Sequence, residues 1–267
     1  GFSLQPSEFV KPCVTVMSGW LLARQKTTEG FPGLFIAFGL SCFIALLLIM
    51  QPDYGMTFVF MATFFAMVIL AGCPLRYIAV FAMLGASLLV LAYFTVDHVH
   101  SRVERFLDPT KGDTYQVDRS LEAFASGGMF GTGPGGGQVK LQLPDAHSDF
   151  IFSVAGEELG FVFLVALIAL YAFIVVRGFS RLRATNSVFA MLGGGGLLFM
   201  VGLQATIHMA SAMQLMPAKG MTLPLVSYGG SSLIAVGMTM GFILSLTRGQ
   251  GTKRHDFRWK PAAASEF

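Results

Sequence analysis

Long apolar segments alternate with polar connectors along the chain. About seven of these segments reach, or nearly reach, the roughly 20 residues that an α-helix needs to cross ~30 Å of hydrocarbon. One connector, 97–149, is much longer than the others and contains most of the acidic residues. The pattern predicts an all-α, polytopic membrane bundle with one large loop. The predicted spans are 9–23, which is the shortest, 33–50, 55–71, 77–96, 150–176, 187–213 and 230–247.

The composition points to the same fold class. Charged residues make up only 12% of the chain and hydrophobic residues 54%, whereas soluble domains carry about 25% charged residues. A large soluble core is therefore excluded, and the net charge of +3 is not a sign of a nucleic-acid partner. Cys13, Cys42 and Cys73 show no metal-binding spacing and are interpreted as small core hydrophobes.

Basic residues indicate the orientation of the helices. If the spans alternate, every connector rich in Lys or Arg falls on one side, together with the tail 248–267. Cytoplasmic loops carry an excess of Lys and Arg, so this side is predicted to be the cytoplasm. The residues that set this orientation, outside the tail, are Arg24, Lys26, Arg76, Arg177, Arg181 and Arg183.

This orientation defines the expected organisation. We expect a membrane domain over 1–247, with the loop 97–149 outside the cytoplasm, followed by a basic cytoplasmic tail over 248–267. Seven spans that end inside must begin outside. Because the chain also starts at Gly1 without an initiator Met, we expect an odd number of further spans to precede it.

The glycine-rich stretch "GTGPGG" at 131–136 formally matches the dinucleotide fingerprint G-x-G-x-x-G. That fingerprint needs a preceding strand, a following helix and access to nucleotides. An outward loop between membrane helices offers none of these. The stretch is instead interpreted as a flexible loop or as a close approach of backbone to substrate.

Asp149 stands where the long loop enters an apolar segment. Ser148 is a candidate cap, and Asp149 in a first helical turn would complement the helix dipole. On a straight helix Glu157 would lie about 12 Å along the axis and ~80° round it, and Glu158 on the opposite face. Glycosidase carboxyl pairs are only ~5–9.5 Å apart. If Asp149 is catalytic, it is therefore predicted to be a single base without these partners, with a pKa lowered by the dipole or raised by burial.

Other ionisable residues leave two interpretations open. Glu8 and Lys11 are three residues apart and share a helix face, either as an interfacial ion pair or beside a wet cavity. Asp53 follows a proline at a turn, where a carboxylate is ordinary. His147 is interpreted as a loop hydrogen-bonder, and His208, inside a span, either as a functional group or as an interhelical hydrogen-bonder.

Several long motifs resemble the FtsW/RodA/SpoVE family, also called the SEDS proteins. They are "QPSEFVK", "QPDYG", "RVERFLDP", "YQVDRSLEAFASGGMFGTGPGGG", "LPDAHSDFIFSVAGEELGF" and "GMTLPLVSYGGSS". The wording "AKGMTLP" is closest to the FtsW division branch. The resemblance implies a ten-span fold with both termini cytoplasmic and a large external loop between the seventh and eighth spans. His208 and Gln214 depart from the family, which usually has Asn and Gly there.

The resemblance implies a peptidoglycan glycosyltransferase that polymerises lipid II and releases undecaprenyl diphosphate. It further implies the bacterial plasma membrane, at the division septum, and a class B penicillin-binding protein as transpeptidase partner among other divisome proteins. A lipid II flippase and a divisome scaffold are the alternatives. An acid in the external loop favours the enzyme, because a flippase has little need of a base there.

The residue roles follow from this resemblance and from the chemistry. Asp149 corresponds to the family's essential external aspartate, while Glu8, Lys11 and Asp53 match positions that line a polar cavity. Developing negative charge needs a cation or a metal. A divalent ion such as Mg²⁺ or Mn²⁺ is expected, without a visible ligand set, and no organic cofactor is expected. The candidate cations are Lys140, then Arg102 and Lys219.

Overall fold

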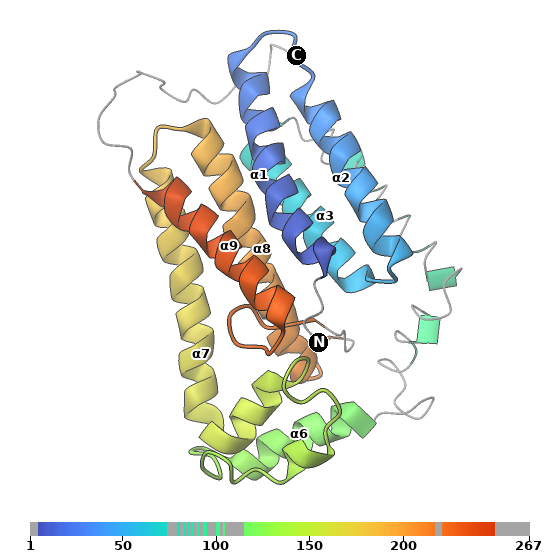
Figure 1. Ribbon diagram of the computed structural model, residues 1–267, viewed down its shortest axis with the longest axis vertical. Helices are drawn as coiled ribbons and strands as arrows, with labels where there is room; N and C mark the ends of the chain where they lie inside the picture. The colour runs from blue at the N-terminus through green and yellow to red at the C-terminus, as the bar shows by residue number, and fades with distance from the viewer. Residues whose placement is uncertain are drawn as a thin grey trace. The chain divides into compact units, whose positions relative to one another are not determined.

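The structure is a computed structural model that describes residues 5–73, 115–216 and 221–248, with scattered positions between 79 and 104. Within this part of the chain the regular structure is entirely helical (Figure 1). All predicted spans are helices except 77–96, which lies largely outside the described residues. The elements are α1 (Pro6–Thr27), α2 (Gly33–Met50), α3 (Tyr54–Leu70), α6 (Tyr115–Gly127), the 3-10 helix η2 (Val139–Gln142), α7 (Ile151–Arg183), α8 (Val188–Ala212) and α9 (Gly230–Thr247).

Four of the described helices, α2, α7, α8 and α9, are long and apolar enough to cross a membrane. The apolar helix α3 has 17 residues and is slightly shorter. Helix α1 has 22 residues but carries charged side chains in its first and last turns. The expected all-helical membrane fold is confirmed for the described residues.

The chain divides into two compact units. The first comprises Gly1–Phe81, Ile174–Val201 and Ile234–Phe267, and the second Ala82–Phe173 and Gly202–Leu233. The long helices α7 and α8 each contribute to both units.

In the first unit, α1, α2 and α3 pack side by side (Figure 1). Leu22 of α1, Ala37 of α2 and Met67 of α3 belong to one buried apolar cluster. Helix α1 lies against α8 at Gly19 and Gly193, where a Cβ on Gly19 would lie 2.7 Å from the Gly193 backbone. Only glycines allow two helices to approach this closely.

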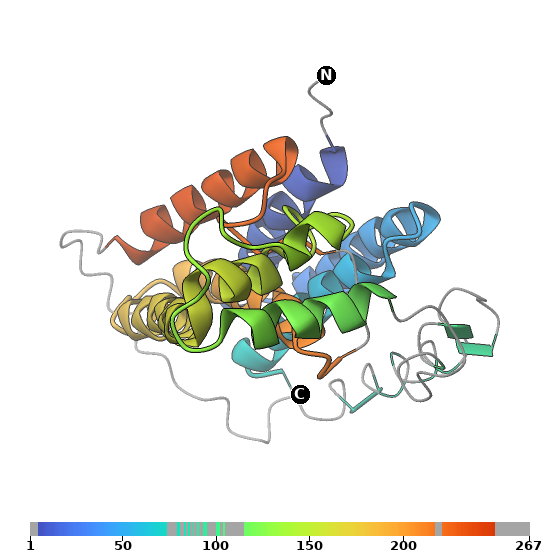
Figure 2. The same cartoon turned by 90° about the horizontal axis from the view of Figure 1, so that it is seen from below.

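In the second unit, α6 lies beside the first turns of α7 (Figure 2). The Phe124 ring packs edge-on against the Phe152 ring at 5.9 Å. The Ser120 hydroxyl is 2.6 Å from the Ser153 hydroxyl and donates to the Ala212 carbonyl at 2.8 Å. A helix of the long loop is thereby fixed to α7 and α8.

Helix α7 is not the single straight span that the apolar run 150–176 predicts. It is kinked at Gly160, whose φ of 78° and ψ of 177° lie outside the helical region. Because the helix begins only at Ile151, Asp149 lies outside it, and the position of Asp149 relative to Glu157 and Glu158 does not follow from straight-helix geometry.

Candidate active site

Asp149 lies in a turn immediately before α7, not in its first helical turn. Its amide donates to the Asp145 carbonyl at 3.0 Å, and the Ser148 hydroxyl donates back to the same carbonyl at 3.3 Å. The amides at the start of α7 instead use the Phe150 carbonyl, at 2.9 Å from Ser153 N. The prediction that Ser148 caps the helix and that Asp149 complements its dipole is wrong, because both residues belong to the preceding turn.

A second loop fastens this turn from the other side. The Ser227 hydroxyl donates to the Ser148 carbonyl at 2.6 Å and accepts from the Leu223 amide at 2.7 Å. The Tyr228 amide donates to the His147 carbonyl at 2.9 Å, and the two rings lie 5.6 Å apart. His147 is thus a loop hydrogen-bonder through its backbone. Two of the motifs, "LPDAHSDFIFSVAGEELGF" and "GMTLPLVSYGGSS", therefore meet at the residues next to Asp149.

The environment of Asp149 changes its acidity. Partial burial raises the pKa of its carboxyl above the ordinary 3.8, and the negative charge of Asp145 adds to this increase. The Ser148 hydroxyl and His147 oppose it. Of the two effects that the sequence left open, burial is dominant. A carboxylate with a raised pKa is a stronger base and is suited to accepting a proton near neutral pH.

Glu157 is a different kind of carboxylate, because it is completely buried. Its Oε1 accepts from the amides of Gln138 and Val139 at 2.7 and 2.8 Å, and its Oε2 accepts from the Lys140 amide at 2.9 Å. We call these three amides the amide cradle. A Cβ on Gly137 would lie 2.8 Å from the Glu157 carboxyl. With its oxygens committed to backbone donors, Glu157 holds the loop and is not placed to assist Asp149.

Glu158 forms an ion pair with Lys140. The charge of Lys140 is thereby compensated inside the protein. That Lys140 neutralises charge on a substrate stays a prediction, and it now requires Lys140 to exchange Glu158 for the substrate. The other two candidate cations, Arg102 and Lys219, lie outside the described residues.

The glycine-rich stretch also lies against α7. Thr132 and Gly133 donate their amides to the carbonyls of Glu157 and Glu158 at 2.9 and 3.0 Å. Gly131, with a φ of 81°, comes so close that a Cβ would lie 2.1 Å from the Glu158 carbonyl oxygen. Gly131 therefore makes its close backbone approach to α7, whereas Gly133 and Gly135 have positive φ values and open space beside them. An approach of this loop to substrate stays a prediction.

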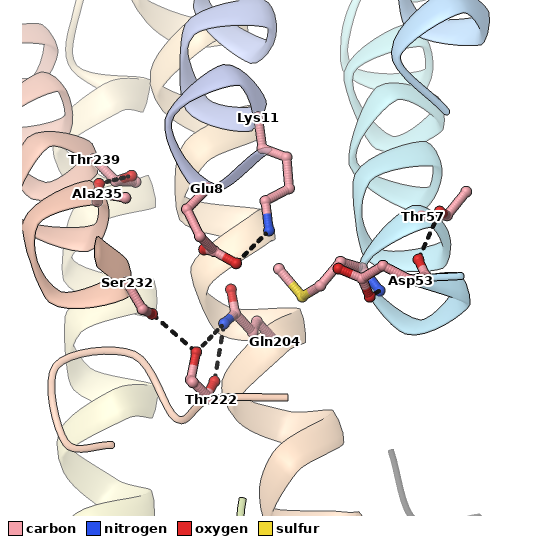
Figure 3. Close-up of polar contacts among 10 residues, drawn as sticks. Glu8, Lys11, Asp53, Thr57, Gln204, Thr222, Ser232, Ala235 and Thr239 are labelled. Carbon is pink, nitrogen blue, oxygen red and sulfur yellow. Dashed lines mark hydrogen bonds and ion pairs between the residues drawn. The ribbon is translucent and has the colours of Figure 1, made fainter. Parts of the chain in front are cut away.

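In the first unit, Glu8 and Lys11 form the ion pair that their spacing predicts, at 3.0 Å (Figure 3). Lys11 is buried and Glu8 nearly so, so the pair is not an exposed interfacial anchor. Asp53 caps α3, accepting from the Met56 amide at 3.1 Å, while the Thr57 hydroxyl donates to its carbonyl. Asp53 thus serves as a helix cap, as is ordinary for a carboxylate at a turn, and its place in a polar cavity stays a prediction.

Sequence reasoning missed a polar cluster in the second unit (Figure 3). The Gln204 amide group donates to the Thr222 carbonyl at 2.9 Å, and the Thr222 hydroxyl lies 3.0 Å from the Ser232 hydroxyl. One turn along α8, His208 Nδ1 lies 2.6 Å from the Met221 carbonyl oxygen. His208 therefore ties α8 to the following loop. Gln204 and His208, four residues apart in an apolar helix, were the signal for this cluster.

No group of three or more His, Cys, Asp or Glu side chains in the described part of the chain is placed to hold a metal ion. The expectation of a divalent ion therefore receives no ligand set from these residues. That a divalent ion binds here stays a prediction.

Known proteins with related sequences identify the family. The FtsW/RodA/SpoVE family, described as "Cell cycle protein", matches residues 1–251. A relative from Caulobacter vibrioides is 46% identical over 248 residues, covering 93% of this chain and 64% of that protein. A relative from Legionella pneumophila is 35% identical over 266 residues, covering 96% of this chain and 66% of that protein. Both are named "Probable peptidoglycan glycosyltransferase FtsW".

Solved structures agree with these relatives. One chain, from a structure described as "Structural coordination of polymerization and crosslinking by a peptidoglycan synthase complex", has a TM-score of 0.70 and 29% identity, over 92% of this chain and 71% of that one. The rod shape determining protein RodA of Thermus thermophilus has a TM-score of 0.61 and 28% identity, over 92% and 66%. This chain, which spans 64% and 66% of the lengths of the two curated relatives, belongs to the FtsW/RodA/SpoVE family of multi-pass membrane proteins.

Proposed function

We propose that this protein is a peptidoglycan glycosyltransferase that polymerises lipid II during cell division, with Asp149 as the general base. One observation carries the assignment. A half-buried carboxylate with a raised pKa stands at the mouth of α7, on a turn fastened by hydrogen bonds to a second loop. The names of the curated relatives supply the reaction class.

The chemistry needs one base at this position. The Asp149 carboxylate takes the proton of an acceptor sugar hydroxyl as that oxygen attacks the anomeric carbon of the donor. The bond from this carbon to the lipid diphosphate breaks, and undecaprenyl diphosphate leaves. Because a diphosphate is already a good leaving group, no second carboxylic acid is required. The committed oxygens of Glu157 fit this one-base scheme.

The partners and the location belong to the same proposal. The solved relative comes from a complex described as combining polymerization and crosslinking. By analogy, the partner of this protein is a class B penicillin-binding protein that crosslinks the new strands. Polymerisation then takes place on the outer side of the bacterial plasma membrane, at the division septum. A role as a divisome scaffold is compatible with these partners but leaves Asp149 without a function.

A lipid II flippase is the second candidate, favoured by the buried ion pair of Glu8 and Lys11. Ionisable residues at membrane depth often line a transport path. The ion pair is internally compensated, however, and a flippase has no need of a base at Asp149.

Reconstitution separates the two functions. The intact protein, with a class B partner and a divalent ion, is placed in liposomes with labelled lipid II in both leaflets. We expect polymer on a gel from the wild type, and none from Asp149→Asn, with lipid scrambling the same in both. If the wild type moved lipid II across the bilayer and made no polymer, the assignment as an enzyme would be wrong and the protein would be a transporter. If the protein neither made polymer nor moved lipid II, the scaffold role would remain as the explanation.

A further inference from the structure

An open cavity of about 450 Å³ lies in the first unit, where the end of α1 meets the start of α8. The side chains proposed to act on lipid II do not line it. Its walls combine a cation and hydroxyl groups with aromatic surface. The residues that matter here are Trp20, Arg24, Thr27, Thr28, Ser187 and Phe189.

Arg24 is the one charged side chain among the described residues that line the cavity. Its guanidinium lies 5.2 Å from the centre of the Trp20 ring and 5.5 Å from that of Phe31. Among the described residues no carboxylate forms an ion pair with Arg24. Glu29 follows in the same connector but does not line the cavity. Stacking occupies the flat face of a guanidinium and leaves the N–H groups on its edge for an acceptor.

The surroundings define what kind of acceptor fits. Planar guanidinium groups match phosphate oxygens in a bidentate manner, and the hydroxyls of Thr28 and Ser187 add further donors, while the Thr27 hydroxyl donates to the Arg24 carbonyl at 3.1 Å. Phe189 and the exposed Trp20 supply apolar surface, and Trp is typical of the membrane–water interface. An acceptor with both a phosphate and an apolar body satisfies both kinds of wall.

The position of the cavity in the membrane further restricts the class of ligand that fits. The cavity lies at the end of α1 that the basic residues place on the cytoplasmic side, and Lys26 is in the same last turn. The last turn of α7, a few residues before Ser187 in the chain, carries Arg181 and Arg183. Basic pockets between membrane helices on the cytoplasmic side are typical binding sites for anionic lipid headgroups.

We propose that this cavity binds the headgroup of an anionic phospholipid, with Arg24 on its phosphate and Trp20 beside the start of its acyl chains. The site is separate from the one proposed for lipid II and does not depend on the enzymatic assignment. It would give the protein a preference for anionic lipid at one defined position, in addition to the general attraction of its basic connectors.

The test compares two neutralising substitutions in the intact protein. Arg24→Gln removes the cation of the cavity, and Lys26→Gln removes an equal charge two residues away that does not line it. The purified variants are titrated with phosphatidylglycerol, phosphatidylcholine or inorganic phosphate, and bound lipid is counted by native mass spectrometry. We expect one phosphatidylglycerol to bind about fivefold more weakly to Arg24→Gln, and nearly unchanged to Lys26→Gln.

Three results would overturn the proposal. The first is an equal loss of phosphatidylglycerol affinity in Arg24→Gln and Lys26→Gln, which would mean a diffuse charge effect. The second is that the wild type binds phosphatidylcholine as strongly as phosphatidylglycerol. The third is displacement of the bound lipid by millimolar phosphate. Arg24→Lys keeps the charge but lacks the planar fork, so it is expected to bind with intermediate strength. If Arg24→Gln lowers the melting temperature, its weaker lipid binding could come from unfolding, and the test then depends on Arg24→Lys, provided that this variant has wild-type stability. Wild-type affinity for phosphatidylglycerol in Arg24→Lys would refute the bidentate contact.

Discussion

Asp149 and Glu157 lie eight residues apart around the start of α7, yet their carboxyl groups are held in opposite ways. Glu157 is fully buried and receives three backbone hydrogen bonds, whereas Asp149 is half-buried and its pKa is raised by incomplete solvation. Hydrogen-bond donors stabilise the charged form of a carboxylate, whereas burial with few donors destabilises it and raises its pKa. The number of donors around each acid thus separates Glu157, which holds the loop, from Asp149, which is proposed as the base.

The largest effect is expected at Asp149. Asp149→Asn removes the base and should lower polymerisation about 10²–10⁴-fold, with expression and membrane insertion unchanged. The control is Asp145→Asn, assayed above the acid limb of the pH profile, because Asp145 holds the turn through its main-chain carbonyl, its φ of 52° suits Asn, and its side chain acts on Asp149 only through its charge. Initial rates with labelled lipid II measure both variants. Near-normal polymer from Asp149→Asn would refute the base assignment.

The carboxylate of Glu8 is compensated by the side chain of Lys11, whereas that of Glu157 is compensated by backbone amides. Lys11→Ala leaves Glu8 charged and nearly buried, which should cost about 3–5 kcal/mol and damage both folding and polymerisation. In the double variant Glu8→Gln/Lys11→Met no charge remains, so folding should recover. Thermal unfolding in detergent is the measurement. A double variant less stable than Lys11→Ala would show that the pair is required for more than charge balance.

Glu157 extends the comparison to the amide cradle. Glu157→Gln places an NH₂ group against backbone N–H donors and should cost about 1–3 kcal/mol through an unsatisfied buried group. The three donors are main-chain N–H groups, which a side-chain substitution does not remove. A second substitution such as Gln138→Ala should therefore not restore stability. Turnover per folded molecule should fall far less than in Asp149→Asn. An equal fall, with the fold intact, would make Glu157 part of the chemistry.

Glu158 is expected to matter less than its neighbour. Glu158→Gln breaks a partly exposed ion pair with Lys140, and such pairs contribute only about 0–1 kcal/mol. We expect a small loss of stability and near-normal turnover, which thermal unfolding and a rate assay on the same preparation would measure. If turnover fell as in Asp149→Asn, Glu158 or the released Lys140 would have to act in the reaction.

The pH profile gives the smallest and most specific test. A base must be ionised, so activity falls as the pH drops through the raised pKa of Asp149. Because the Asp145 charge contributes to that raised pKa, Asp145→Asn should move the acid limb of kcat/KM to lower pH. A limb that stays in place, in a variant with wild-type stability, would assign the titration to another group.

The sequence predicted the helices well, because hydropathy over about 20 residues reports directly on membrane burial. It also predicted the ion pair of Glu8 with Lys11, which depends on helical spacing alone. The role of Asp149 as the base stays a prediction. It did not predict the kink at Gly160, since a single glycine does not interrupt the hydropathy pattern of an apolar segment. The amide cradle and the contacts of Ser227 and Tyr228 join segments far apart in sequence, and single-sequence periodicity contains no information on such pairs.

The break at Gly160 also has a mechanical consequence. In a continuous helix the amides of Phe161 and Val162 would bond to the carbonyls of Glu157 and Glu158. Here they donate to Gly128 and Met129, at 2.9 and 3.2 Å, and the two freed carbonyls accept from the loop. The loop therefore completes the hydrogen-bond ladder of α7. Residues 128–133 of the loop are thus held to α7 on both sides of the break, so a tilt of this helix would carry that part of the loop with it.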